Sequence, residues 1–407
     1  MCQIYIMRNF FKIYNNLWTE KSNKLSTLIK KISFITISLG ISAVIISSFI
    51  LTGFKNAISN KVYNFSGHYT VSSYANGLSF KNSPIDLNKG VYKESKTLSE
   101  IGSVHPFILS SALIQSKESE IEGVIFKGVS SDYINNIQPH LITFNNNLNL
   151  KNSIIISAEI GKITSLNLGD SVTIFFPNDP PIFRKLIISG IYETGLEEID
   201  NTIVIGDINL SRKIYKWNEN QVSGLNIYLQ DETSIDSLYD KLKNISSFDE
   251  FIESTNSKYI QIFDWLKLLD KNVIIFFVII VFVASFNILS VILILIMDKT
   301  QLIGTLKSFG TKSRFIHLLF FKVGFKLSIS AIIFANFISF LFYLLQKNFK
   351  LFKLNKSNYY IDHIPVDINI LNTLMINLSM IAMIIISIYL PIIFIQKLKI
   401  LDTIRFD

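Results

Sequence analysis

The chain has 407 residues, of which 49% are hydrophobic and only 17% are charged, against roughly 25% charged residues in a typical soluble domain. Its formal net charge is +8, and Cys2 is its single cysteine. These values exclude a uniformly soluble protein and an intrachain disulfide. The positive charge flanks apolar segments, so we attribute it to membrane topology and expect no nucleic-acid binding.

Four apolar windows predict transmembrane helices. They cover residues 32–53, 273–297, 327–345 and 371–395, and each has or approaches the ~20 residues that a helix needs to cross a ~30 Å hydrocarbon core. The second window contains no charged residue, which argues against a buried helix of a soluble protein. A basic leader precedes the first window, which exceeds a signal peptide in apolar length and lacks an Ala-x-Ala site, so we expect an uncleaved anchor.

The distribution of charge predicts the orientation. Residues 53–271 contain 20 Lys and Arg against 25 Asp and Glu, whereas the rest of the chain is strongly basic. Because Lys and Arg accumulate on cytoplasmic flanks, we place both termini and residues 298–316 in the cytoplasm and residues 53–271 outside. Four lysines disagree, since they fall in a loop that this topology places outside: Lys347, Lys350, Lys353 and Lys356.

The predicted fold class is therefore a membrane protein with four transmembrane α-helices and a large α+β extracytoplasmic domain between helices 1 and 2. In chain order the expected segments are a cytoplasmic leader (1–31), helix 1 (32–53), the extracytoplasmic domain (54–271), helix 2 (272–297), a cytoplasmic loop (298–316), helix 3 (317–345), a short external loop (346–370), helix 4 (371–395) and a cytoplasmic tail (396–407).

The extracytoplasmic segment alternates short β-rich runs with turns, and we expect at least two lobes. Helical spacing is present at Ile160, Ile163 and Leu166, in a helix expected to end at Gly169, and again in residues 234–245, where Ser234 is a plausible N-cap. Seven runs have the length and composition of strands: residues 68–74, 122–129, 152–157, 171–176, 185–192, 201–208 and 223–230.

We expect no active site in this domain. Four carboxylates in YETGLEEID could serve acid–base chemistry, but a solvated turn between two strands is the favoured interpretation: Glu193, Glu197, Glu198 and Asp200. The five histidines are scattered, and none shows the i, i+4 spacing of a zinc-binding helix. We therefore predict no catalytic residue, no metal site and no cofactor-binding residue in this chain.

The segment FFPNDPPIFRK, residues 175–185, has a stiff polar tip with aromatic residues beside it. A plain hairpin loop explains it without any function. Exposed aromatic residues next to proline also suit the docking of a partner. The residues that would form such a contact are Phe176, Pro177, Asn178, Asp179, Pro180, Pro181 and Phe183.

The loop after the second window reads MDKTQLIGTLKSFGTKSRF, residues 297–315. It is not a phosphate-binding loop, because five residues separate its glycines and Thr311 follows the second. As a helix it places Leu302, Ile303, Leu306 and Phe309 on one face, and Gly310 would end it as a C′ residue. Such an apolar ridge can press into a groove of another protein or into lipid headgroups.

This loop resembles a pattern of the FtsX-like permeases of ABC transporters, in the lipoprotein-releasing (LolC/LolE-type) branch. That family's stretch Glu-Arg-x-x-Glu-Ile-Gly-Ile-Leu-Lys-Ala-x-Gly corresponds to DKTQLIGTLKSFG, with Leu302 at the second acidic position. Other family-like stretches lie at Gly53-Phe54, at residues 190–195, at residues 359–366 and from Tyr389 to the C-terminal Arg405-Phe406-Asp407. The resemblance covers essentially the whole chain.

The resemblance implies a mechanism without chemistry in this chain. A cytoplasmic ATPase dimer would bind ATP and dock on the loop as a coupling helix, through Thr300, Gln301, Leu302, Ile303, Gly304, Leu306, Lys307, Phe309 and Gly310. A second permease copy or a paralogue would complete a lipoprotein groove in the bacterial inner membrane, in contact with membrane lipid. Small residues and one amide are expected at that groove or in helix packing: Ser38, Gly40, Ser42, Ala43, Ser47 and Asn287.

In this reading, lipoprotein cargo passes from the outer leaflet to a periplasmic carrier, and the 175–185 loop falls near the family's carrier-binding hook. Asn287 and Asn336 are expected to form interhelical hydrogen bonds. A MacB-like exporter and an FtsX-like mechanotransmission permease remain alternatives, because the same four spans would serve them. A membrane sensor with an extracytoplasmic ligand-binding domain is a more distant alternative, since the longest internal segment is only the leader.

Overall fold

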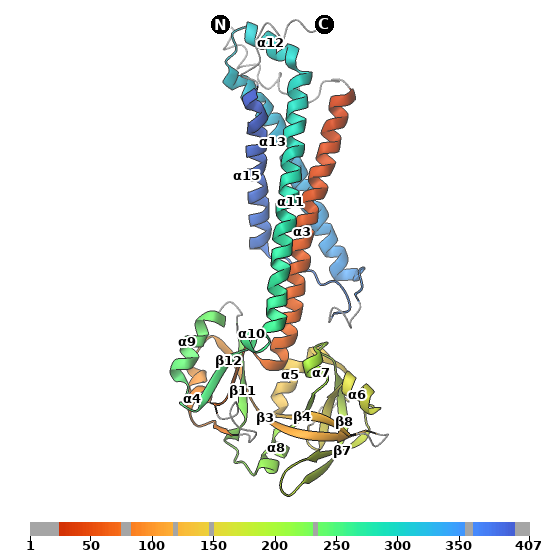
Figure 1. The fold of residues 1–407 in the computed structure, drawn as a ribbon, viewed down its shortest axis with the longest axis vertical. Coiled ribbons are helices and arrows are strands. Elements are labelled where there is room, and N and C mark those ends of the chain that lie inside the picture. Colours follow the sequence, from red (N-terminus) through yellow and green to blue (C-terminus); the bar gives the residue numbers. More distant parts are fainter. Residues whose placement is uncertain are drawn as a thin grey trace. The chain divides into compact units, whose positions relative to one another are not determined.

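The structure is a computed structural model, and it describes residues 24–74, 83–116, 121–145, 150–230, 235–354 and 361–394. These residues divide into two compact units (Figure 1). The helical unit contains the described parts of 1–55, 266–353 and 363–407, and the α+β unit contains those of 56–265 and 354–362. Much of the predicted leader and all of the predicted tail lie outside the described residues.

Four of the described helices are long and apolar enough to cross a membrane. Three of them, α3, α11 and α13, extend well beyond their apolar windows, and no Gly or Pro interrupts the flanks 54–66 and 260–272 of the first two. Helix α3 also begins inside the segment that was expected to be leader. The four helices are α3 (Lys24–Ser66), α11 (Ile260–Asp298), α13 (Ser313–Phe349) and α15 (Ile370–Phe394), and the short α12 (Thr300–Ser308) lies between α11 and α13.

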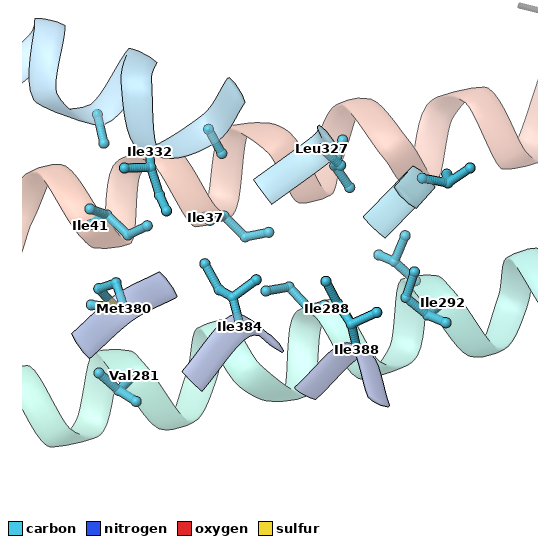
Figure 2. Close-up of a cluster of buried hydrophobic side chains, with 14 of the residues drawn as sticks. Ile37, Ile41, Val281, Ile288, Ile292, Leu327, Ile332, Met380, Ile384 and Ile388 are labelled. Atoms are coloured by element: carbon cyan, nitrogen blue, oxygen red, sulfur yellow. The ribbon is translucent and has the colours of Figure 1, made fainter. Parts of the chain in front are cut away.

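The core of the helical unit is built from β-branched and other aliphatic side chains of all four long helices. Figure 2 shows Ile37 and Ile41 of α3 facing residues of the other three helices. Small residues let the helices approach closely, and Ala331, Ala335 and Ser339 are completely buried. The remaining labelled members of this cluster are Val281, Ile288, Ile292, Leu327, Ile332, Met380, Ile384 and Ile388.

Polar side chains join the helices within this core. Ser33 donates to the side-chain oxygen of Asn287, which links α3 to α11. Asn336 of α13 and Asn377 of α15 exchange two hydrogen bonds of 2.8 and 3.1 Å. The expected interhelical bonds of Asn287 and Asn336 are thus confirmed, and they satisfy amides that would be costly to leave unpaired in a low-dielectric environment.

In the α+β unit, ten of the described strands form one sheet. Strands β4 and β9 pair in parallel, as do β6 and β8, and the other pairs are antiparallel. The order is β12 (Glu250–Ser254), β1 (Tyr69–Ser73), β11 (Gly224–Leu229), β3 (Ile101–Gln115), β4 (Ile121–Val129), β9 (Ile203–Asp207), β6 (Ser153–Ser157), β8 (Ile182–Tyr192) and β5 (Leu141–Phe144), while β7 (Ser171–Phe176) pairs with β3 and β8.

Short helices and a second small sheet complete this unit. Its buried apolar residues gather in three clusters along the sheet, so the expected lobes share one sheet that continues through the long strand β3. The helices are α4 (Gly90–Glu94), η2 (Ser95–Thr97), η3 (Ser131–Tyr133), α5 (Ile134–Ile137), η4 (Gln138–His140), α6 (Ala158–Thr164), α7 (Glu197–Asp200), α8 (Ile208–Tyr215), α9 (Ile235–Ile245) and α10 (Thr255–Lys258), and β2 (Ile85–Asp86) pairs with β10 (Gln221–Val222).

All seven predicted strand runs contain strands, whereas β2, β3, β5, β10 and β12 were not predicted and one helix end was wrong. Strand β3 was missed, because its burial alternates from Ile108 to Gln115 while its hydrophobicity does not: Ser110 is buried, whereas Leu109 and Leu113 are only partly buried. Helix α6 ends at Thr164 and not at Gly169, since Ser165 takes a left-handed conformation, and Ile163 is 45% exposed. The predicted N-cap Ser234 lies outside the described residues.

Candidate functional site

The loop between α11 and α13 forms the short helix α12, and its end has a defined cap. Gly310 has φ +74°, and its N–H donates to the Lys307 carbonyl at 2.9 Å. The Thr311 N–H donates to the Leu306 carbonyl at 3.0 Å. These two bonds form a Schellman motif with Gly310 at C′, which is where the sequence predicts the helix to stop.

The apolar ridge of α12 does not face outward as expected. Ile303 is 1% exposed and belongs to the core of the helical unit, and Leu306 packs against the same core. Gly304 is also buried. The prediction that Ile303 and Gly304 contact a partner is therefore wrong for this structure, because the long helices already cover the apolar side of α12.

The exposed face of α12 is mostly polar and ends in one aromatic ring. Gln301, Thr305 and Ser308 are exposed at helical spacing, and Phe309 directly after the helix is 65% exposed. Leu302 is half-buried. Thr305 satisfies its hydroxyl on the carbonyls of its own helix. This face therefore offers a partner a polar surface with one exposed aromatic ring, that of Phe309.

Charged residues hold the start of α12. The Lys299 ammonium lies 3.6 Å from the Asp298 carboxylate, and both side chains are largely buried. Lys30 of α3 interacts electrostatically with both groups. The start of α12 is thus fixed by charges on α3 and α11, while Thr300 donates to the Met297 carbonyl.

The residues predicted for a groove or for helix packing find partners within this chain. Ser38 and Ser42 are buried, and the Ser42 carbonyl accepts a 3.3 Å hydrogen bond from Ser339 of α13. A Cβ at Gly40 would lie 3.3 Å from the Ile280 side chain of α11. Ala43 and Ser47 are half-buried. These residues let α3 pack closely on α11 and α13.

The 175–185 loop is a hairpin between β7 and β8, and one of its predicted contact residues is not available. Phe176 is completely buried and meets Phe126 edge to face at 5.4 Å, so the expectation that it borders an exposed tip is wrong. The inward alternation of β7 places Phe176 in the core. Phe183 is 61% exposed, and Asn178 donates to the Ile214 carbonyl. The other tip residues, Pro177, Asp179, Pro180 and Pro181, are exposed.

The carboxylate cluster is structural rather than fully solvated. Asp200 is buried, and its carboxylate accepts from the Thr194 N–H and hydroxyl and from the Gly195 N–H at 2.7–3.0 Å. Burial raises the pKa of Asp200, while these bonds oppose the rise. Glu197 and Glu198 are exposed as expected. Among the described residues, no group of His, Cys, Asp and Glu could hold a metal ion.

The residues around the end of α3 form a socket that was not predicted from the sequence. The Tyr63 and Asn64 carbonyls accept from the Gly67 N–H and the Tyr228 hydroxyl. The Phe65 carbonyl accepts from Lys127 at 2.9 Å and from the Tyr133 hydroxyl. With the Asn226 amide assigned in the orientation that satisfies both of its ends, its nitrogen donates to the Ser66 carbonyl at 3.1 Å and its oxygen faces Lys127. The last four carbonyls of a helix lack partners within the helix, and here each of them has one.

Lys127 is the centre of this socket. Its ammonium has three acceptors, the Phe65 carbonyl, the Tyr133 hydroxyl and the Asn226 side-chain oxygen, which match three N–H donors. The rings of Phe65 and Tyr133 lie 4.6 Å away. Burial, with a smaller contribution from Lys258, lowers the pKa of Lys127. A lysine in the apolar run VIFKGV was the available signal.

A second missed feature is a strap, residues 363–368, between α13 and α15. A Cβ at Gly53 would lie 2.6 Å from the Pro365 backbone, so only glycine permits this contact. The Asp367 N–H donates to the Phe49 carbonyl at 3.0 Å. Two family-like stretches that are distant in the sequence therefore meet at this point.

These features define a class of membrane protein in which a large α+β unit lies in sequence between the first two of four apolar helices. Two family models match the chain: the MacB-like periplasmic core domain over residues 32–245 and the FtsX-like permease C-terminal model over residues 274–400. The chain therefore belongs to the FtsX-like permease family of ABC transporters, with a MacB-like periplasmic core domain.

Curated relatives carry lipoprotein-release names. The chain is 27% identical, over 92% of its length and 93% of the relative, to the "Lipoprotein-releasing system transmembrane protein LolC" of Buchnera aphidicola subsp. Schizaphis graminum. It is 21% identical to the LolE protein of that system in Haemophilus influenzae, over 89% of this chain and 91% of the relative. The periplasmic region of MacB from Actinobacillus actinomycetemcomitans aligns with a TM-score of 0.34 and 14% identity, over 48% of this chain and 91% of that chain.

Proposed function

We propose that this chain is the permease subunit of an ATP-driven transporter that extracts lipoproteins from the outer leaflet of the inner membrane and delivers them to a periplasmic carrier. The observation that carries the proposal is its similarity over 92% of its length to a protein named for lipoprotein release. Acyl chains are held in a bilayer by about 0.8 kcal/mol per CH₂. Extraction therefore needs work, which a separate ATPase dimer would supply by binding and hydrolysing ATP.

In this proposal, α12 is the surface on which the ATPase docks. The exposed residues Gln301, Thr305, Ser308 and Phe309 would contact the ATPase, while buried Ile303 and half-buried Leu306 pack α12 against the long helices. This packing supports the role, because a displacement of α12 would be passed through these contacts to the core of the helical unit.

We propose that the apolar outer surface of the helical unit contacts a second permease copy or paralogue and membrane lipid. Helix α11 exposes a continuous apolar side that includes Ile275, Phe282 and Phe286, each more than half exposed. A side of this kind needs an apolar environment. We propose that acyl chains of cargo pass beside α3 and α11. The exposed hairpin tip with Phe183 is the proposed contact for the carrier.

Depletion of the chain in its host tests the transported substrate. We expect outer-membrane lipoproteins to accumulate in the inner membrane, as measured by membrane fractionation and immunoblotting. Re-expression of the wild-type chain should restore their distribution. Normal lipoprotein distribution under complete depletion would refute lipoprotein release.

The docking role of α12 is tested by Phe309→Asp, which removes the exposed apolar anchor without touching the core. We expect loss of co-purification with the ATPase while membrane insertion is retained. The matched control is Phe248→Asp, since Phe248 is fully exposed in the α+β unit, and its co-purification should be normal. Unchanged ATPase association of Phe309→Asp would exclude this face as the docking surface.

A MacB-like exporter or an FtsX-like mechanotransmission permease is the second candidate. The match of residues 32–245 to the MacB-like core domain favours it, because that model covers the whole α+β region up to residue 245. This candidate predicts that depletion leaves lipoprotein sorting intact, so the fractionation experiment separates the two functions.

A further inference from the structure

Helix α13 carries lysines near both ends of its apolar part. Lys326 and Lys347 bracket residues 327–346, which contain no charged side chain, and at 1.5 Å per residue this stretch is about 30 Å long. That length matches the hydrocarbon core of a typical bilayer. Lys347 therefore lies at one membrane–water interface, and the turn that follows it lies among the lipid headgroups.

The interfacial turn, residues 349–353, alternates apolar and basic side chains in the sequence FKLFK. Phe349 is 69% exposed, Leu351 59% and Phe352 52%. Lys350 and Lys353 are exposed between them. Aromatic residues favour the membrane interface, and lysine can keep its ammonium in the headgroup layer while its stem contacts apolar groups.

The backbone of this turn is fixed, so the exposure of its apolar side chains is built into the fold. Gln346 is buried, and its side-chain amide binds the Phe352 backbone through both its oxygen (3.2 Å) and its nitrogen (3.4 Å). The same nitrogen donates to the Ile364 carbonyl at 2.9 Å. The Ile364 N–H donates to the Phe352 carbonyl at 3.0 Å. A buried glutamine thus holds Phe352 in place.

The charge of the turn favours an anion. The Lys347 ammonium donates a 2.8 Å hydrogen bond to the Tyr343 hydroxyl and interacts electrostatically with Asp367. Lys350 takes a left-handed conformation directly after the helix. Lys350 and Lys353 present two ammonium groups beside three exposed apolar side chains. This combination complements an acidic phospholipid, whose phosphate would meet the ammonium groups and whose acyl chains would meet the apolar side chains.

We infer that the interfacial turn binds anionic glycerophospholipid, with Lys350 and Lys353 on the phosphate groups and with Phe349, Leu351 and Phe352 among the upper acyl carbons. This binding gives a physical role to the lysines that disagree with the charge-based topology. It does not depend on the nature of the transported substrate.

The test uses the full chain with p-benzoylphenylalanine in place of Phe349, reconstituted in vesicles of equimolar phosphatidylglycerol and phosphatidylcholine. After irradiation, mass spectrometry identifies the attached molecules. We expect phosphatidylglycerol to exceed its bulk proportion, since each lysine near an anionic surface contributes a factor of about five. Attachment in bulk proportion, or attachment to protein instead of lipid, would overturn the inference.

The paired variant Lys350→Gln/Lys353→Gln should reduce the enrichment to the bulk value while the chain still inserts. The control Lys213→Gln/Lys216→Gln changes two exposed lysines of the α+β unit and should leave the enrichment unchanged. Undiminished enrichment in the Lys350/Lys353 variant would overturn the assignment of the phosphate contacts.

Discussion

At the scale of single residues, the α+β unit relies on polar side chains buried in unusual environments. Lys127 is fully buried, and its described partners are a carbonyl, a hydroxyl and an amide oxygen. A cation at the C-terminal end of a helix interacts favourably with the helix dipole. Contacts of an ammonium with aromatic ring faces add to this stabilisation. The end of α3 is therefore fixed by electrostatics as well as by packing.

Replacing Lys127 with Met should destabilise the α+β unit. Met keeps most of the apolar volume but leaves the Asn226 side-chain oxygen without its donor, which costs about 1–3 kcal/mol for an unsatisfied buried group, while the Phe65 carbonyl keeps the Tyr133 hydroxyl. The measurement is hydrogen exchange of β1 and β11 in the full chain, with Lys213→Met as the exposed control. Equal protection in both variants would show that the ammonium contributes nothing.

Two histidines make the stability of the α+β unit depend on pH. Burial lowers the pKa of His68 and of His140 to about 4, and Lys61 also contributes at His140. The Leu229 N–H donates to His68 Nδ1, and His140 Nε2 faces the Asn64 amide at 3.4 Å. Protonation of either nitrogen would break these contacts.

Between pH 6.5 and 4 the unfolded chain binds more protons at these sites, so stability falls as the pH falls through this window. At ~1.4 kcal/mol per pKa unit the loss approaches about 3 kcal/mol per histidine. Thermal unfolding of the α+β unit at pH 7 and pH 4.5 measures it. The double variant His68→Gln/His140→Gln should flatten this pH dependence, and an unchanged slope would contradict the assignment.

At the scale of elements, two short segments, α12 and the strap, cover parts of the long helices and so determine which of their surfaces are exposed. Helix α12 turns its apolar side into the helical core and its Gln301–Thr305–Ser308 face outward. The strap binds α3 through the Phe49 carbonyl and passes over Gly53. Neither arrangement follows from the local sequence, because each depends on which surface of a distant helix is available.

Gly53→Val should displace the strap. Its Cβ would lie 2.6 Å from the Pro365 backbone, and backbone at this distance has to move. We expect faster hydrogen exchange at the Asp367 amide, whose bond to Phe49 would be lost. Gly123→Val provides the control, since a Cβ there meets nothing within 4 Å. Normal protection of Asp367 in Gly53→Val would disprove the steric role of Gly53.

At the scale of the whole molecule, we predict that the chain crosses the membrane four times, with α12 on the cytoplasmic side and the α+β unit outside. Apolar length defines the crossings, and the basic flanks define the side. A Cys2→Ala chain with one new cysteine at Thr305 or at Phe248 tests the prediction, because both positions are exposed. In intact spheroplasts a membrane-impermeant maleimide should label position 248 and leave 305 unlabelled. Labelling of 305 from outside would invalidate the topology.

The sequence by itself determined the features that depend on near neighbours. Uncharged apolar runs marked the four long helices, alternation marked seven strands, and Gly310 marked the end of α12. Each of these signals arises within one or two turns or within one strand, where backbone geometry and side-chain periodicity operate.

Only the tertiary structure decided which surface of each element is buried. It placed Ile303 and Phe176 inside, gathered Lys127, Tyr133 and Asn226 around the end of α3, and brought Gly53 against the strap. These outcomes join residues far apart in the chain. Burial is set by the sum of such distant contacts, because a side chain is removed from water only when another element covers it.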